Sequence, residues 1–399
     1  MNAHNAFVRL ETIDTLKEFL LLAREWDSLV AQSRQVSPFL AHGWLSAWWA
    51  EYSVPSDRMH VIVCRDGPTN SLVGALPAFI EATGRTFSCR RLRNMADSPV
   101  GSSGLGCIAD RRVEADVVAC VSAHIAETRD MWDVVDLRAM DTEQQGAFLS
   151  ALVEALRGDT ILSRTDIAQQ CPTMPLPLSW DGLLSALSHD SRRKLRRRRR
   201  DVESVGAVCI ECASAPHALD SCLRDAIGLF AQSMARKHGR PFAVSARYAR
   251  FLASISEKFL ASGQLRLLFL SVDGHRVAFQ YEIRAGDTMY AFQTGFDKGW
   301  ARYKVGTVLF AYSIQAAISE GCTRFDFGPG LEPYKLQWDA DHLRPLTDLR
   351  IYGRSPAGVL AAGYDEVSRT TKERGKSLLP RRLSARIARR RSWRRLSHL

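Results

Sequence analysis

Hydrophobic residues between positions 265 and 294 follow the pattern of three consecutive strands. Apolar segments at 265–272, 276–283 and 288–294 have the length of buried strands and are separated by short polar turns. Asp273-Gly274, between the first two segments, suits a tight type I′ turn, which requires a positive φ at both residues. The pattern predicts a hairpin that continues into a third strand.

The residues after these strands predict a loop, a helix and one more strand. A polar and aromatic loop runs to Gly306, and an apolar helix is expected at 307–319, followed by a strand at 323–327. Upstream, helical spacing predicts two amphipathic helices, one at 219–234 and one that begins after Ser245 as its N-cap. The second half therefore has the order β-β-β-loop-α-β.

The first half contains the same kinds of element in a related order. Its predicted helices lie near 16–26, 113–128 and 143–157, and its predicted strands at 59–64, 72–79, 132–137 and 160–165. Three prolines within 171–177 favour an extended connector between the halves. We expect an α/β protein with mixed α+β sheets, with domains at 1–172 and 178–352 and a tail at 353–399. The repeated order supports a duplicated domain as a hypothesis.

Composition and length are those of an ordinary globular protein. The 399 residues are 46% hydrophobic and 24% charged, which suits two domains with their own cores. No stretch approaches the roughly 18 apolar residues of a membrane span, and the first residues lack the apolar region of a secretory signal, so we expect a cytoplasmic protein. Nine cysteines show no disulfide pattern, and the C-x-x-C of Cys209 and Cys212 has no second ligand pair, so no metal site is expected.

Positive charge is concentrated in two segments. Residues 191–200 hold eight cations and residues 381–399 hold eight arginines, neither with an acid, in a chain whose net charge is +11. The first segment lies on a predicted helix at 183–204, where it forms either a solvated face turned to an acidic substrate or a nucleic-acid site. The second is either disordered or a basic helix on an anionic membrane surface, such as the inner membrane face.

Residues 302–307 contain groups that suit a pyrophosphate. Arg302 and Lys304 supply two cations, Gly306 leaves the backbone accessible, and Tyr303 and Thr307 complete the loop. The start of a helix adds free N–H groups and the positive end of its dipole. The loop therefore suits coenzyme A, although cations before a helix are also common on ordinary solvated surfaces.

Three motifs carry a resemblance to a known family. They are the Asp273-Gly274 hairpin, the G-F-D…Y-x-x-G loop that opens a helix, and the closing F-D-F-G-x-G-x-E-x-Y-K-x-x-W at 325–338. Together they resemble GNAT-superfamily acyltransferases of the CelD-like type, which are associated with bacterial polysaccharide biosynthesis and are related to FemAB-like double-GNAT proteins. The resemblance spans roughly residues 20–345, and the closing string is its most specific part.

The resemblance implies two tandem GNAT-like domains, with the second one catalytic. It implies transfer of an acyl group from acetyl-CoA or another acyl-CoA to a small-molecule or saccharide amine, such as an amino sugar or polysaccharide precursor, by direct attack on the thioester. The loop departs from the usual R/Q-x-x-G-x-G/A pattern, because Tyr303 stands first and only Gly306 is a glycine. Two alternatives stay open: aminoacyl transfer from tRNA, and a non-catalytic accessory of polysaccharide biosynthesis that binds polyanions or membranes.

Acyl transfer to an amine needs a base, a polarised carbonyl and a proton for the departing thiolate. The candidates lie near predicted strand ends, in loops or in the closing string. They are Glu282, Asp326 and Glu332 as bases, Tyr334 or Tyr303 as the acid, and Arg240, Lys335 and Trp338 as substrate-binding residues. Each has an ordinary structural alternative: Asp326 at a strand end can satisfy backbone groups, and Tyr334 and Trp338 can be packing aromatics.

Overall fold

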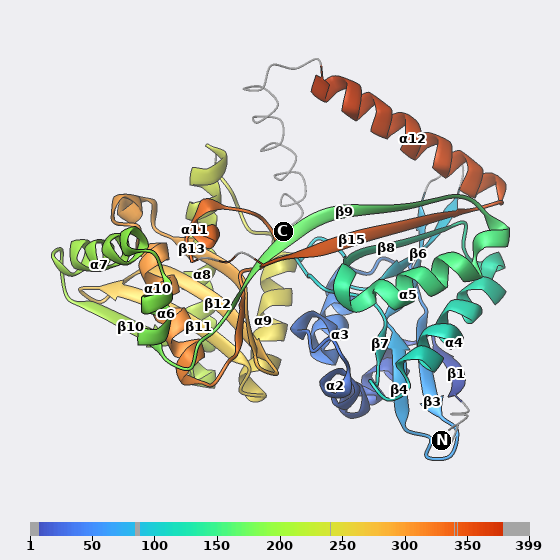
Figure 1. Ribbon diagram of the computed structural model, residues 1–399, viewed down its shortest axis with the longest axis horizontal. Helices are drawn as coiled ribbons and strands as arrows, with labels where there is room; N and C mark the ends of the chain where they lie inside the picture. The colour runs from blue at the N-terminus through green and yellow to red at the C-terminus, as the bar shows by residue number, and fades with distance from the viewer. Residues whose placement is uncertain (1–7, 84–87, 240, 339, 341, 378–399) are drawn as a thin grey trace. The chain divides into compact units, whose positions relative to one another are not determined.

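The computed structural model describes residues 8–83, 88–239, 241–338, 340 and 342–377 (Figure 1). Within these, unit 1 consists of residues 8–169 and 345–377, and unit 2 of residues 170–344. The sequence instead suggested a break between 172 and 178 and a second domain that ends at 352. The boundaries differ because the chain crosses between units within the strands near 170 and 345, a long-range pairing that local patterns do not encode.

Unit 1 contains two sheets flanked by helices. Its elements are β1 (Val8–Ile13), α1 (Leu16–Leu21), α2 (Ala23–Gln32), η1 (Pro38–Leu40), α3 (His42–Tyr52), β2 (Arg58–Met59), β3 (Val61–Asp66), β4 (Leu72–Leu76), β5 (Ala78–Thr83), β6 (Cys89–Asn94), β7 (Ile108–Ala109), α4 (Glu114–Glu127), η2 (Arg129–Met131), β8 (Val134–Asp141), α5 (Thr142–Ala155), η3 (Arg157–Asp159), the first part of β9 (Thr160–Pro175), most of β15 (His342–Gly353) and α12 (Pro356–Ser377).

One sheet of unit 1 has the antiparallel order β1-β3-β4-β7. In the other, β5 pairs antiparallel with β2 and β6, β6 runs parallel to β8, and β8 pairs antiparallel with β15. The strand predicted at 72–79 is divided at Pro77 into β4 and β5, which belong to different sheets. Proline has no N–H to donate to a ladder, which makes it a natural point of division. Helices α4 and α5 bury Val121 and Phe148 in the core beside Leu137.

Unit 2 is built around one sheet. Its elements are the end of β9, α6 (Trp180–Ala186), α7 (His189–Glu203), β10 (Val208–Cys212), η4 (Pro216–Ala218), α8 (Leu219–His238), α9 (Ala246–Ala261), β11 (Leu265–Val272), β12 (His275–Ala285), β13 (Thr288–Phe296), η5 (Lys298–Tyr303), α10 (Val305–Ser319), β14 (Arg324–Asp326) and α11 (Pro333–Leu336). The strand order is β10-β11-β12-β13-β14-β9, and only β13 and β14 are parallel.

Local sequence signals explain most elements of unit 2. Asp273 and Gly274 have φ of 49° and 81°, as a type I′ turn requires, and Ser245 caps α9 by accepting the N–H of Tyr248 at 3.1 Å. The predicted helix 183–204 is two helices, because the backbone is extended at Leu187 and Ser188 starts α7 with a new N-cap.

The C-terminal segment differs from its prediction. The sequence suggested that the domain pattern ends at Tyr352, whereas β15 continues to Gly353 and α12 follows from Pro356. The apolar residues Leu383, Ile387, Trp393 and Leu396 of the predicted basic helix lie outside the described residues. No helix in the described part of the chain is long and apolar enough to cross a membrane.

Candidate active site

In unit 2 the two parallel strands separate after three residue pairs. Strand β13 pairs with β14 only from Thr288 to Tyr290, whereas on its other side it pairs with β12 as far as Phe296. Beyond β14, Phe327 and Gly330 donate their N–H groups to carbonyls of β9. The chain after β14 therefore follows β9, and β13 keeps an edge to which no described strand pairs. Such an edge is able to pair with an extended ligand.

A β-bulge lies where the strands separate. The register between β12 and β13 passes from Tyr281–Gln293 to Glu282–Ala291, so Phe292 is an extra residue on β13. Bulges locally increase strand twist and recur next to active sites. The bulge in β13 begins after Ala291, next to Tyr290, which is the last residue of β13 that pairs with β14.

The start of α10 carries the groups predicted to bind a pyrophosphate. Lys304 adopts the left-handed conformation (φ 57°, ψ 36°) and no side chain caps the helix, so its first N–H groups are available to an anion. Lys304 and Arg302 are exposed, and the Arg302 guanidinium lies 4.6 Å from the centre of the Tyr303 ring and donates to its hydroxyl. Tyr303 packs on the core beneath α10, which makes it a platform for Arg302.

Thr307 and Gly306 belong to the first turn of α10. The N–H of Thr307 donates to the Lys304 carbonyl at 2.9 Å, so the backbone N–H of this residue is already used. A side chain at position 306 would meet only Phe296, at ordinary contact distance. Gly306 is therefore not required by packing within the protein, and a close approach by a ligand remains a reason for a glycine there.

Lys335 is buried and holds the loop after β14. Its ammonium donates to the carbonyls of Gly328 at 3.1 Å and Pro329 at 2.8 Å and lies 3.2 Å from the Glu332 carboxylate, and the residue is only 4% exposed. The sequence assigned Lys335 to substrate binding. In the structure its ammonium holds the Gly-Pro-Gly loop beside β13, and its other contacts are with Glu332 and the Tyr334 ring, whose centre lies 5.9 Å away.

Glu332, a candidate base, lies between two ammonium groups. Its carboxylate is 3.3 Å from Lys237 of α8 and 3.2 Å from Lys335. Burial alone would raise the pKa of Glu332, but the two lysines outweigh burial and hold it below its ordinary value. A carboxylate stabilised in its ionised form accepts a proton weakly, so this site favours a structural role for Glu332.

Asp326 is bound by an arginine that the sequence did not connect to it. Its carboxylate accepts from Arg344 at 2.6 and 3.1 Å and from the N–H of Gly328 at 2.7 Å, and it is 2% exposed. These bonds fix the turn that leads the chain away from β13. The ordinary alternative for Asp326, satisfying groups at a strand end, is what the structure shows.

Glu282 lies beneath α10 and away from solvent. Its carboxyl group accepts from Gln280 at 2.6 Å and from the hydroxyl of Ser313, and the residue is 1% exposed. Burial raises the pKa of Glu282 to about 7, despite the hydrogen bonds from Ser313 and Gln280, which oppose the shift. Glu282 is the one carboxyl of the candidate set with a raised pKa, but in this conformation it is enclosed.

Tyr334 combines a packed ring with a free hydroxyl. The ring lies 5.5 Å from that of Phe310 and packs on the same core cluster as Ala291, beside the point where β13 leaves β14. Its hydroxyl is partnered by no described residue and is not fully enclosed. Burial, and next the charge of Glu332, raise the pKa of Tyr334, so the phenol is protonated at neutral pH. It is the candidate whose hydroxyl is available to a ligand.

The remaining predicted residues fall outside this site. Trp338 is 2% exposed and belongs to the core cluster beneath α10, so it is a packing residue here. Arg240 lies outside the described residues. No group of three or more His, Cys, Asp and Glu side chains that could hold a metal occurs in residues 8–377, leaving aside positions 84–87, 240, 339 and 341.

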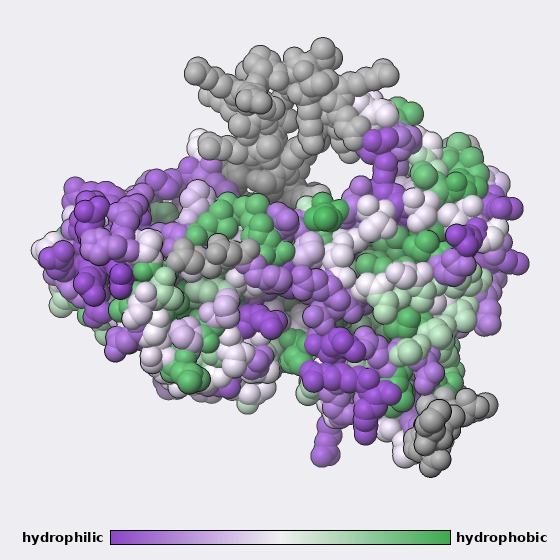
Figure 2. Space-filling view, viewed as in Figure 1, coloured by the Kyte–Doolittle hydropathy of each residue, from purple (hydrophilic) through white to green (hydrophobic). Residues whose placement is uncertain are grey.

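The basic helix α7 packs on α10 through its apolar side. Leu195 and Val202 contact the core, and Arg198 donates to Gln337 of α11 at 2.7 Å. Four other cations of the helix pair with its own acidic residues. Three further cations have neither an ion pair within the described chain nor the contact made by Arg198; they are Arg192, Arg196 and Arg200, spaced by four along one side of the helix. Figure 2 shows a hydrophilic surface over α7.

Comparison with known proteins places unit 2 in a family. Residues 189–336 match the family model described as acetyltransferase (GNAT) domain. Unit 2 is a GNAT domain. The match confirms the resemblance drawn from the sequence and supports an acyltransferase that uses an acyl donor. No sequence match was found among the curated proteins.

Solved structures extend the likeness over most of the chain. FemX superposes with a TM-score of 0.59 at 10% identity and covers 85% of this chain and 96% of its own. The C-terminal domain of a putative lysylphosphatidylglycerol synthetase from Agrobacterium fabrum gives 0.52 at 11% identity, with coverage of 87% and 95%. L-PGS from Bacillus licheniformis gives 0.50 at 12%, with coverage of 85% and 93%. At these identities the matches show the fold, and they confirm the mixed α/β class.

Unit 1 repeats the strand arrangement of unit 2, but hydrogen bonds join the segments that follow its two parallel strands. Strands β6 and β8 are parallel over three residue pairs, as β13 and β14 are, and Asp136 occupies the position of Asp326. Beyond them, the Asn94 side chain exchanges two hydrogen bonds with the Arg138 backbone at 2.7 and 2.9 Å. The N–H groups of Gly104 and Leu105 both donate to the Ala139 carbonyl. These hydrogen bonds join the segments that follow the parallel strands of unit 1, whereas in unit 2 no described strand pairs with β13 beyond Tyr290.

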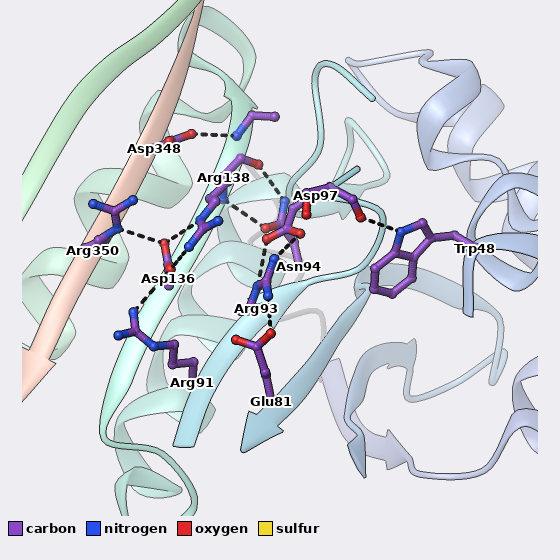
Figure 3. A network of polar contacts seen from close by, with 12 residues as sticks. Trp48, Glu81, Arg91, Arg93, Asn94, Asp97, Asp136, Arg138, Asp348 and Arg350 are labelled. Atoms are coloured by element: carbon purple, nitrogen blue, oxygen red, sulfur yellow. Dashed lines mark hydrogen bonds and ion pairs between the residues drawn. The ribbon is translucent and has the colours of Figure 1, made fainter. Parts of the chain in front are cut away.

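A network of buried charges surrounds the point where Asn94 joins β6 and β8 (Figure 3). Asp136 is fully buried and contacts Arg91, Arg138 and Arg350. Burial would raise the pKa of Asp136, but the arginines outweigh it and lower the value to about 2. An aspartate at this register position is thus held by arginine in both units, which supports the structural role of Asp326.

Sequence reasoning missed two residues that bind the carboxylates of the closing string. Lys237 lies 95 residues before Glu332, and Arg344 lies 18 residues after Asp326; neither belongs to a recognisable motif. One signal was available: Val135-Asp136-Leu137 and Phe325-Asp326-Phe327 each place an aspartate between apolar residues on the strand that follows the long helix. Alignment of those two strands would have indicated the internal repeat.

Proposed function

We propose that the GNAT domain of unit 2 transfers an acyl group from acyl-CoA to an amine. The observation that carries this proposal is the divergence of β13 from β14 next to the uncapped start of α10. An extended thioester arm fits the edge of β13 to which no described strand pairs, and a pyrophosphate fits the first turn of α10 with Arg302 and Lys304. In unit 1 the corresponding segments are joined by hydrogen bonds, which favours a non-catalytic, structural role for that unit.

The reaction follows from the groups around the gap. The neutral amine attacks the thioester carbonyl, a C–N bond forms and the C–S bond breaks. Tyr334 gives its phenolic proton to the departing thiolate, since its hydroxyl has no partner among the described residues. The carboxylates of Asp326 and Glu332 are already bound by Arg344 and the two lysines. The amine therefore releases its proton to water. An amino sugar or polysaccharide precursor as the acceptor rests on the resemblance to CelD-like proteins.

One observation favours a second donor. Arg192, Arg196 and Arg200 extend over about 12 Å along α7, from the rise of 1.5 Å per residue, and have no ion pair within the described chain. Three unpaired arginines in a row attract a polyphosphate, so aminoacyl-tRNA is the alternative donor. A non-catalytic accessory role is less well supported, because no described strand pairs with β13 beyond Tyr290 and no side chain caps the start of α10.

Ligand titration followed by thermal unfolding distinguishes these functions. Acetyl-CoA should raise the unfolding temperature saturably, and Arg302→Ala/Lys304→Ala should weaken its binding about tenfold, which corresponds to 1.4 kcal/mol. Lys17→Ala/Arg157→Ala removes two exposed cations from unit 1 and should bind acetyl-CoA as the unmodified protein does. Stabilisation by charged tRNA alone, lost in Arg192→Ala/Arg196→Ala/Arg200→Ala, would favour the second donor. No response to either ligand would contradict both transferase proposals.

A further inference from the structure

The last helix of the described chain, α12, is attached to unit 1 by one side only. Ala361 and Ala362 are buried against Val134 and Tyr352. The hydroxyl of Tyr352 donates to Asp365 at 2.7 Å. These contacts fix the rotation of the helix about its axis and so decide which side faces outward.

The outward side of α12 is apolar and unpartnered within the described chain. Leu360, Tyr364 and Val367 are exposed by 55%, 74% and 65%, and Val359 by 49%. Leu360, Tyr364 and Val367 are spaced by four and three residues, which aligns them on one face, opposite Ala361 and Ala362. Figure 2 shows hydrophobic residues over the first part of this helix. Single exposed apolar residues are ordinary, but three aligned on one helix face mark an interaction surface.

The residues that follow the helix indicate what covers this face. Only a few residues after Ser377 the chain enters 381–399, which contains eight arginines and no acid, with Leu383, Ile387 and Trp393 among them. We propose that the outer face of α12 lies in the headgroup region of an anionic lipid bilayer, which the positive charge of the following segment attracts. Apolar burial and charge attraction then act on adjacent parts of one segment, as in interfacial helices.

A second copy of the chain fits this face less well. A second copy supplies no negative charge to the segment with eight arginines that follows α12, and in a parallel pair of helices the two like-charged segments would repel. A bilayer that contains phosphatidylglycerol supplies the opposite charge to both. The inference concerns unit 1 and the chain after it, so it does not depend on the donor proposed for unit 2.

Vesicle flotation of the full chain tests the proposal. The protein should float with vesicles of phosphatidylglycerol and phosphatidylcholine in equal amounts and not with phosphatidylcholine alone. Leu360→Glu/Tyr364→Glu/Val367→Glu should reduce the bound fraction about tenfold, since both apolar burial and attraction are lost. The matched control Leu20→Glu/Leu21→Glu/Ile167→Glu adds the same three charges at exposed positions of unit 1 and should remain bound.

Thermal unfolding of both variants shows whether the fold is intact, which is expected because all six positions are exposed. Equal binding of the α12 variant and its control would overturn the proposal, as would failure of the unmodified protein to float. A dimer that becomes a monomer in the α12 variant, measured by sedimentation velocity, would assign the face to a second copy instead.

Discussion

Replacement of Tyr334 by phenylalanine should lower the turnover of acetyl-CoA with glucosamine by about 100-fold. The change removes the hydroxyl that protonates the departing thiolate, and proton transfer of this kind contributes about 10²- to 10⁴-fold. The ring contact with Phe310 is kept, so the unfolding temperature should be unchanged. Release of the free thiol, followed with a thiol reagent, measures the rate.

Tyr312→Phe is the matched control for this substitution. Tyr312 lies on α10, and the centre of its ring is 4.9 Å from the Arg199 guanidinium. It has no role in the proposed reaction. It should lose little activity. A Tyr334→Phe variant that turns over as fast as the control would show that another group protonates the thiolate.

Glu282→Gln should change how the stability of the protein depends on pH. The pKa of Glu282 is raised to about 7 in the folded state from an ordinary value of 4.5. Between these values the folded state holds more protons than the unfolded state, so its stability falls as pH rises through 7. The loss between pH 4 and pH 8 amounts to about 3 kcal/mol, at 1.36 kcal/mol for each pH unit. The glutamine variant, which stays neutral, should lack this loss.

Urea unfolding at several pH values gives the difference in free energy between the variant and the unmodified protein. That difference should grow in favour of Glu282→Gln from pH 4 to pH 8. Glu154→Gln, at a position whose side chain is 69% exposed, should show no such trend. A flat difference for Glu282→Gln would mean that the buried carboxyl group titrates near its ordinary value.

The sequence was sufficient for elements set by local chemistry. The Asp273-Gly274 turn and the Ser245 cap each depend on the intrinsic preferences of one or two residues, and both occur as predicted. Helix α10 and strand β14 follow from apolar runs with distinct periods. The closing string at 325–338 identified the family because its residues form one compact loop and helix beside β13.

The sequence was insufficient where a contact depends on tertiary structure. The contacts of Asp326 with Arg344 and of Lys335 with loop carbonyls belong to no recognisable pattern. The units of the structure begin at other residues than the predicted domains, because β9 and β15 each pair with strands more than 100 residues away in sequence. Whether a gap between parallel strands is open or closed depends on side chains such as Asn94, which no periodicity predicts.

The proposed reaction requires the acyl donor to lie between β13 and β14 of unit 2. Hydrogen–deuterium exchange of the protein with and without acetyl-CoA tests this position. Acetyl-CoA should slow exchange at residues 291–296 and 302–307, because the edge of β13 to which no described strand pairs and the first turn of α10 become hydrogen-bonded. Residues 94–105 of unit 1 should exchange at the same rate in both states. Protection in unit 1, or no protection at β13, would contradict the account.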